Sequence, residues 1–184
     1  MAKDSEHGVT LVELLVYIML SSIVLAIASA FLISMLQNSS TTTAVGTSST
    51  AAQLTARSIE TGIRNSSDFN MTNPTGSDQM VVARVISRGA AVTWSCQAWY
   101  YSATEGSVRT TSSAAAIVAP TAAQLATWTL LNDGVVPLSG TTIFAVSGRE
   151  LNVAFKTSAD GHPPVAITTS AFSRAGATGS VSCY

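Results

Sequence analysis

Charge is scarce in this chain of 184 residues, which has 9 Lys and Arg and 10 Asp and Glu, 10% of the total. A typical soluble domain has about 25%. The formal net charge of -1 offers no attraction for a polyanion, so no nucleic-acid partner is expected. The two histidines, His7 and His162, lie far apart, and no phosphate-binding loop or metalloprotease motif occurs. We therefore predict no enzyme, catalytic residue, metal site or cofactor.

Small neutral polar residues replace the absent charge. The chain has 26 Ser and 23 Thr, while apolar residues make up 47% of the sequence. This composition favours a secreted or surface protein, and the length fits one ordinary domain with an anchor added.

Charged residues are absent altogether between Glu13 and Arg57. Residues 14–36 are predominantly apolar, and as a helix they would extend about 35 Å, slightly more than the ~30 Å hydrocarbon core of a bilayer. The few serines in this run can bond back to the preceding helical turn, so they are compatible with lipid. The run predicts one membrane-spanning helix.

A secretory signal peptide and a plain single-pass anchor are two interpretations of this run. Ala28, Ser29 and Ala30 could form a signal cleavage site, but Asp4 and Glu6 cancel the positive charge that a signal peptide needs. A plain anchor has the right length but gives no reason for a carboxylate at Glu13, which costs about 2.5–3.5 kcal/mol in a bilayer.

The segment from Gly8 to Val16, with Thr10 and Glu13 inside it, resembles the processing motif of the type IV pilin family, which includes the pseudopilins of type II secretion. The resemblance implies that a prepilin peptidase cuts between Gly8 and Val9 and methylates the new amino terminus at Val9, where phenylalanine is usual. Glu13 would then be the fifth mature residue and would pair with the Val9 ammonium of a neighbouring pilin subunit during assembly. Membrane lipid would surround the helix before assembly.

The chain then divides into a leader at residues 1–8, a transmembrane and filament-core helix at 9–36, a linker and amphipathic half-helix at 37–67, and a head at 68–184. Residues 37–50 are rich in Ser and Thr. They predict either an exposed linker or a helical segment that can melt when the subunit enters a filament. Ala52, Ala56, Ile59 and Ile63 fall on one helical face and predict a helix over about residues 51–65.

Strand patterns dominate the remaining sequence. Strands are expected at residues 80–86, 91–102, 142–146, 151–157 and 165–172, with turns at 88–89, 147–149 and 160–164. Residues 120–131 predict either a short helix capped at Thr121 or a loop. The expected fold class is α+β, with the long N-terminal helix packed on an antiparallel sheet.

The order of these strands also resembles the larger minor pilins and the J-type pseudopilins. The resemblance rests on the aromatic-rich residues 94–101, the Asp133–Gly134 turn, and Thr169 and Ser170 before Arg174. It implies a minor subunit rather than the main building block.

The two cysteines, Cys96 and Cys183, allow a single intramolecular pairing. In a head outside the cytoplasm, a disulfide would tie the end of the chain to the aromatic-rich strand. The alternative is two unpaired thiols, one buried and one at a frayed terminus.

Two functions remain at this point. The first is a structural minor subunit of a type IV pilus or a secretion pseudopilus, held in the bacterial cytoplasmic membrane with its C-terminal head outside and then moved into a surface or periplasmic filament. The second is a single-pass anchored surface binding protein that never polymerises.

Overall fold

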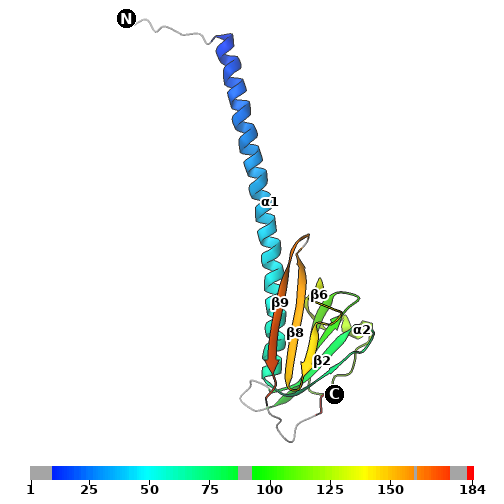
Figure 1. Ribbon diagram of the computed structural model, residues 1–184. Coiled ribbons are helices and arrows are strands. Elements are labelled where there is room, and N and C mark those ends of the chain that lie inside the picture. The colour runs from blue at the N-terminus through cyan, green and yellow to red at the C-terminus, as the bar shows by residue number, and fades with distance from the viewer. Residues whose placement is uncertain (1–9, 87–92, 160, 175–181) are drawn as a thin grey trace, which may run out of the picture. The chain divides into compact units, whose positions relative to one another are not determined.

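The computed structural model describes residues 10–86, 93–159, 161–174 and 182–184, and it confirms the α+β class (Figure 1). One long helix, α1 (Leu11–Arg64), is followed by antiparallel sheets. The chain divides into two compact units, residues 1–43 and residues 44–184. The second unit is called the head below.

The first unit contains the apolar part of α1. Its large apolar side chains from Leu11 to Leu36 are all exposed. This helix is long and apolar enough to cross a membrane, in agreement with the sequence prediction.

The Ser/Thr-rich residues 37–50 are helical, so their interpretation as a non-helical linker is wrong. The hydroxyls of Ser40, Thr41 and Thr42 donate to carbonyl oxygens three or four residues earlier, at 2.8, 3.0 and 2.9 Å. Each hydroxyl is therefore satisfied by the helix itself and needs no water. This local bonding lets a sequence of poor helix formers continue α1 towards the head.

Nine strands form two sheets in the described part of the head, and the first sheet is a meander in the order β1-β2-β3-β4-β5. In the second sheet, β8 pairs with β6 and β7, and β9 also pairs with β8. The strands are β1 (Ser66–Thr72), β2 (Gln79–Ile86), β3 (Trp94–Ser102), β4 (Ser107–Ser113), β5 (Thr129–Asn132), β6 (Val135–Pro137), β7 (Phe144–Ser147), β8 (Glu150–Ala159) and β9 (His162–Phe172).

The main core lies where α1 packs against both sheets. The predicted face of α1 supplies Ala52, Ala56, Ile59 and Ile63, which are all buried, so the predicted helical face is confirmed. The sheets supply alternate residues of their inward faces, as the two-residue period of a strand requires. They include Val81, Ala83, Trp99, Tyr101, Val108, Val135, Phe144, Leu151, Val153 and Phe155.

A second, smaller core covers the opposite face of the first sheet. Met80 and Val82 of β2 and Ala98 and Tyr100 of β3 point to this side. Ile117, Trp128 and Leu125 of the short helix α2 (Ala122–Leu125) cover them. Thr121 caps α2 with a reciprocal bond to Gln124, so the predicted short helix and its cap are confirmed.

Gln79 links the two sheets through its buried side-chain amide. Its Oε1 accepts from the N–H groups of Ile143 and Phe144 at 2.7 and 2.9 Å, and its Nε2 donates to the Phe144 carbonyl at 2.9 Å. The amide thus supplies buried hydrogen bonds to the backbone of Ile143 and Phe144 at the start of β7.

The five expected strands correspond to β2, β3, β7, β8 and β9, apart from small shifts at their ends. Positions 88–89, 91–92 and 160 lie outside the described residues. The last turn is tighter than expected, because β9 already begins at His162 and includes Pro163 and Pro164. Proline lacks a backbone donor, and both prolines lie at an irregularity in the pairing of β8 with β9, between the pairs Thr157–Val165 and Ala159–His162.

Candidate processing and assembly site

Glu13 lies in the first turn of α1. The Glu13 N–H donates to the Thr10 hydroxyl at 3.3 Å, and the Leu14 N–H donates to the Thr10 carbonyl at 3.1 Å, so Thr10 caps the helix. Gly8 and Val9 lie outside the described residues, and their predicted roles stay predictions.

Tyr17 contacts the Glu13 carboxylate from one turn further along α1. Its hydroxyl donates to Glu13 Oε1 at 3.2 Å, and both side chains lie on the exposed surface of the helix. Long helical side chains lean towards the N-terminus, so a residue at i+4 naturally covers residue i. The carboxylate therefore has a neutral donor from its own helix, but no cation among the described residues is paired with it.

Residues 3–29 match a family model described as the prokaryotic N-terminal methylation motif. The match contains Gly8, Val9 and Glu13 and about two thirds of the apolar run, residues 14–29. The chain therefore carries the N-terminal motif of prepilins, followed by a helix that is long and apolar enough to cross a membrane. The motif implies cleavage by a prepilin peptidase and assembly with pilin-like subunits in general. Searches of the curated proteins and of the solved structures find no match.

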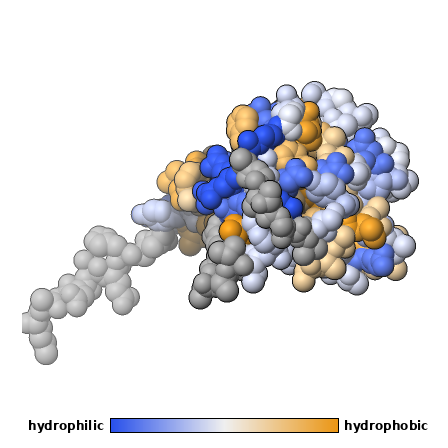
Figure 2. Space-filling view, turned by 90° about the horizontal axis from the view of Figure 1, so that it is seen from below, coloured by the Kyte–Doolittle hydropathy of each residue, from blue (hydrophilic) through white to orange (hydrophobic). Residues whose placement is uncertain are grey.

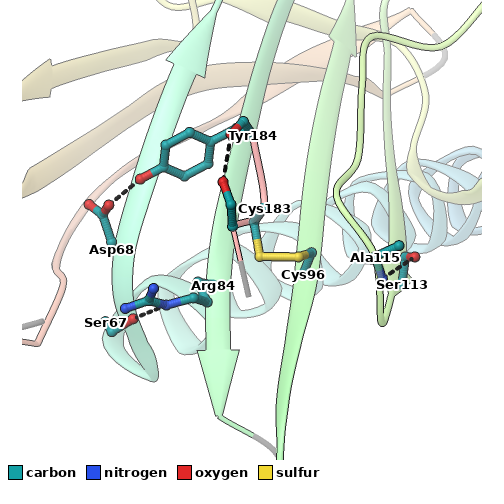
Figure 3. Close-up of a disulfide and its surroundings, with 9 residues drawn as sticks. Ser67, Asp68, Arg84, Cys96, Ser113, Ala115, Cys183 and Tyr184 are labelled. Carbon is teal, nitrogen blue, oxygen red and sulfur yellow. Dashed lines mark hydrogen bonds between the residues drawn. A yellow bond between two sulfur atoms is a disulfide. The ribbon is translucent and has the colours of Figure 1, made fainter. Parts of the chain in front are cut away.

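Cys96 and Cys183 form a disulfide, so the pairing considered from the sequence is confirmed (Figure 3). Cys96 comes from β3, and both residues are buried within the smaller core. The Cys183 carbonyl also accepts from the Ile117 N–H at 3.1 Å. The end of the chain is therefore held in the head by a covalent bond and a backbone hydrogen bond.

Tyr184 adds a third attachment beside the disulfide. Its hydroxyl donates to Asp68 of β1, as Figure 3 shows. Arg84 of β2 donates to the Ser67 hydroxyl at 2.7 Å and lies over the ring of Trp94, 5.3 Å from its centroid. This cluster could not be predicted from the sequence, because its members come from strands and from the last residues of the chain, which only the folded head brings together.

Ionisation of Tyr184 is expected to weaken the head only at alkaline pH. Partial burial and the bond to Asp68 raise the pKa of Tyr184 to about 12, while Arg84 acts in the opposite direction. Because the pKa is higher in the folded state, the stabilisation is complete below the ordinary pKa of 10.0 and is lost as the pH rises towards 12.

Ultraviolet absorbance of tyrosinate tests this expectation. The difference between the titration curves of wild type and Tyr184→Phe should have its midpoint near pH 12 in the folded protein. In denaturant, the same difference should move to the ordinary pKa of 10.0. Equal midpoints in the two conditions would contradict the bond to Asp68 in solution.

In the view of Figure 2, hydrophobic residues are scattered among neutral and hydrophilic ones. Within the described ranges, no three His, Cys, Asp or Glu residues gather in a group that could hold a metal ion.

Proposed function

We propose that this protein is a non-catalytic, minor structural subunit of a type IV pilus or a type II secretion pseudopilus. A prepilin peptidase cuts it between Gly8 and Val9, and it enters the filament through α1 with its head outside the cytoplasm. The single observation that carries the proposal is the carboxylate of Glu13 at the start of an apolar membrane helix.

The cost of this carboxylate supports a role in assembly. An ionised Glu in hydrocarbon costs about 2.5–3.5 kcal/mol. Tyr17 offers the carboxylate only a neutral hydroxyl, and the sequence has no cation between Glu13 and Arg57. Cleavage before Val9 creates an ammonium at the membrane end of each subunit. The amine of a neighbouring subunit can therefore supply the positive charge that pairs with the Glu13 carboxylate. This pairing would set the axial register of the two subunits.

The disulfide supports the proposed side of the membrane. Disulfides persist in oxidising compartments and are rare in the cytosol. The bond between Cys96 and Cys183 lies in the head, so it favours a head on the outer side of the cytoplasmic membrane. The minor role is supported by the strand order, which resembles the larger minor pilins.

Replacing Glu13 by valine tests the proposal in the native host. Glu13→Val should ease membrane insertion and leave processing intact, but reduce incorporation into sheared filaments by at least about a hundredfold, because breaking a buried ion pair costs about 3–5 kcal/mol. Ser29→Val is the matched control, since its hydroxyl bonds only to the Leu25 carbonyl of its own helix, at 2.7 Å.

Intact mass of the membrane-extracted protein gives an independent measurement. A chain that begins at methylated Val9 supports the proposal. A chain that begins at Met1 or Ala2, or a Glu13→Val protein that enters filaments as well as wild type, would contradict it and favour a non-polymerising anchored binding protein.

A further inference from the structure

Tyr17 has a feature that the proposed function does not explain. It places a hydroxyl on the surface of an otherwise apolar helix segment, and this hydroxyl donates to Glu13 Oε1 at 3.2 Å. Other hydroxyls of this segment behave differently, since Ser22 and Ser29 donate to the carbonyls of Met19 and Leu25 on their own helix. The rigid ring of tyrosine carries its hydroxyl away from the backbone, so the carboxylate is the acceptor that remains within reach.

Within its own chain, the backbone N–H of Thr10 is an alternative hydrogen-bond donor for the Glu13 carboxylate. Thr10 and Glu13 have the spacing of a capping box, in which the Glu side chain folds back onto the N–H of the capping residue. Only half of this motif is formed, because Glu13 N–H donates to Thr10 Oγ1 without a reciprocal bond from the side chain. Among the described groups, the carboxylate accepts from Tyr17 instead.

We propose that Tyr17 is a positioning residue for assembly. It draws the Glu13 carboxylate away from the capping conformation and occupies one oxygen, Oε1, so that Oε2 stays available to an ammonium from a neighbouring subunit. This inference rests on the proposed function and deepens it. Prior orientation matters because the ion pair forms with less side-chain freedom left to lose.

The bond also helps the subunit before assembly. A carboxylate without any hydrogen bond is costly in hydrocarbon, and one donor from the same helix offsets part of that cost. The donor is neutral, so it does not replace the cation that assembly supplies. Tyr17 therefore stabilises the subunit before assembly, and pairing of the Glu13 carboxylate with a cation still lowers the free energy further.

Tyr17→Phe tests the inference because it removes the hydroxyl and keeps the ring. Incorporation into filaments should fall by up to about tenfold, because the Glu13 side chain is then not oriented in advance and loses more freedom when the ion pair forms. Processing should not change, so the mature chain should still begin at methylated Val9 and be lighter than wild type only by the oxygen atom that the substitution removes. Ser22→Ala is the matched control, since it removes a hydroxyl of the same segment that does not contact Glu13, and it should assemble like wild type.

A spectroscopic measurement separates positioning from simple packing. In mature full-length protein labelled with 13C-glutamate and held in lipid vesicles, the Glu13 carboxyl resonance is assigned by its absence in Glu13→Val. Tyr17→Phe should shift this resonance, while Ser22→Ala should leave it in place.

Three outcomes would overturn the inference: an unshifted resonance, normal assembly of Tyr17→Phe, or equal losses for Tyr17→Phe and Ser22→Ala. If Glu13→Val is excluded from filaments in the same experiment, the proposed function survives these outcomes. If Glu13→Val assembles like wild type, the proposed function itself fails, and the positioning role fails with it.

Discussion

Replacing Cys96 and Cys183 together by alanine is expected to lower the free energy of unfolding of the head by about 4 kcal/mol. The disulfide joins residues 87 positions apart, and closing a loop of this size restricts the unfolded chain by about 4–5 kcal/mol in the loop-entropy model. Denaturant unfolding of the full mature chain in detergent measures the change. Tryptophan fluorescence reports the head selectively, because Trp94, Trp99 and Trp128 all lie there.

Reduced wild type is the matched control, because it loses the cross-link but keeps both sulfur atoms in the smaller core. We expect it to lose most of the stability that the double alanine variant loses. The denaturant slope should also rise, since an unfolded chain without the cross-link exposes more surface. An unchanged unfolding midpoint after complete reduction would show that the disulfide contributes nothing to the stability of the head.

The N-terminal motif and the long apolar helix could be predicted from sequence because each depends only on residues that are neighbours in the chain. A long uncharged run needs no information about the rest of the fold, and Gly8 and Glu13 are recognised by their spacing around Val9. The amphipathic face with Ala52, Ile59 and Ile63 is also local, since helical periodicity places these residues together before any packing is known.

Elements rich in hydroxyl residues could not be predicted in this way. Residues 37–50 have weak helix propensity, but their hydroxyls bond back to the helix and the segment continues α1. The strands β1 and β4 were missed for a related reason: neither has a clear apolar alternation, and each is held by its neighbours in the first sheet. In β1 and β4, pairing with the neighbouring strands outweighs the weak strand propensity of the residues themselves.

Contacts between segments that are distant in the chain cannot be predicted from local sequence patterns. The buried amide of Gln79 bonds backbone groups 64 and 65 residues away, and Tyr184 reaches Asp68 across 116 residues. The contact of Tyr17 with Glu13 is different. The i, i+4 spacing of Tyr17 and Glu13 was visible in the sequence. A tyrosine in an apolar run is common, however, and only the direction of its hydroxyl shows that it contacts the carboxylate.

Gly62→Ala is expected to destabilise the head by about 2 kcal/mol, although alanine is normally the better helix former by about 1 kcal/mol. A Cβ at this position would lie 2.1 Å from Trp99 Cη2 and 2.4 Å from Cζ2. The Trp99 ring is fully buried, and its Nε1 donates to the Ser58 hydroxyl at 3.1 Å, so the ring cannot turn aside without breaking this bond. Overpacking of this kind costs about 1–3 kcal/mol or more.

Gly46→Ala provides the matched control on the same helix, because no atom beyond the adjacent helix backbone lies within 4 Å of its added Cβ. It should leave stability unchanged or raise it by up to about 1 kcal/mol. Trp99→Phe should restore part of the loss in Gly62→Ala, since phenylalanine lacks the outer ring atoms that the new Cβ would meet. If Gly62→Ala unfolds at the same denaturant concentration as Gly46→Ala, then α1 does not approach β3 as closely as this contact requires. If instead Gly62→Ala lowers the free energy of unfolding while Gly46→Ala leaves it unchanged or raises it, the packing of α1 on the sheet requires a glycine at position 62.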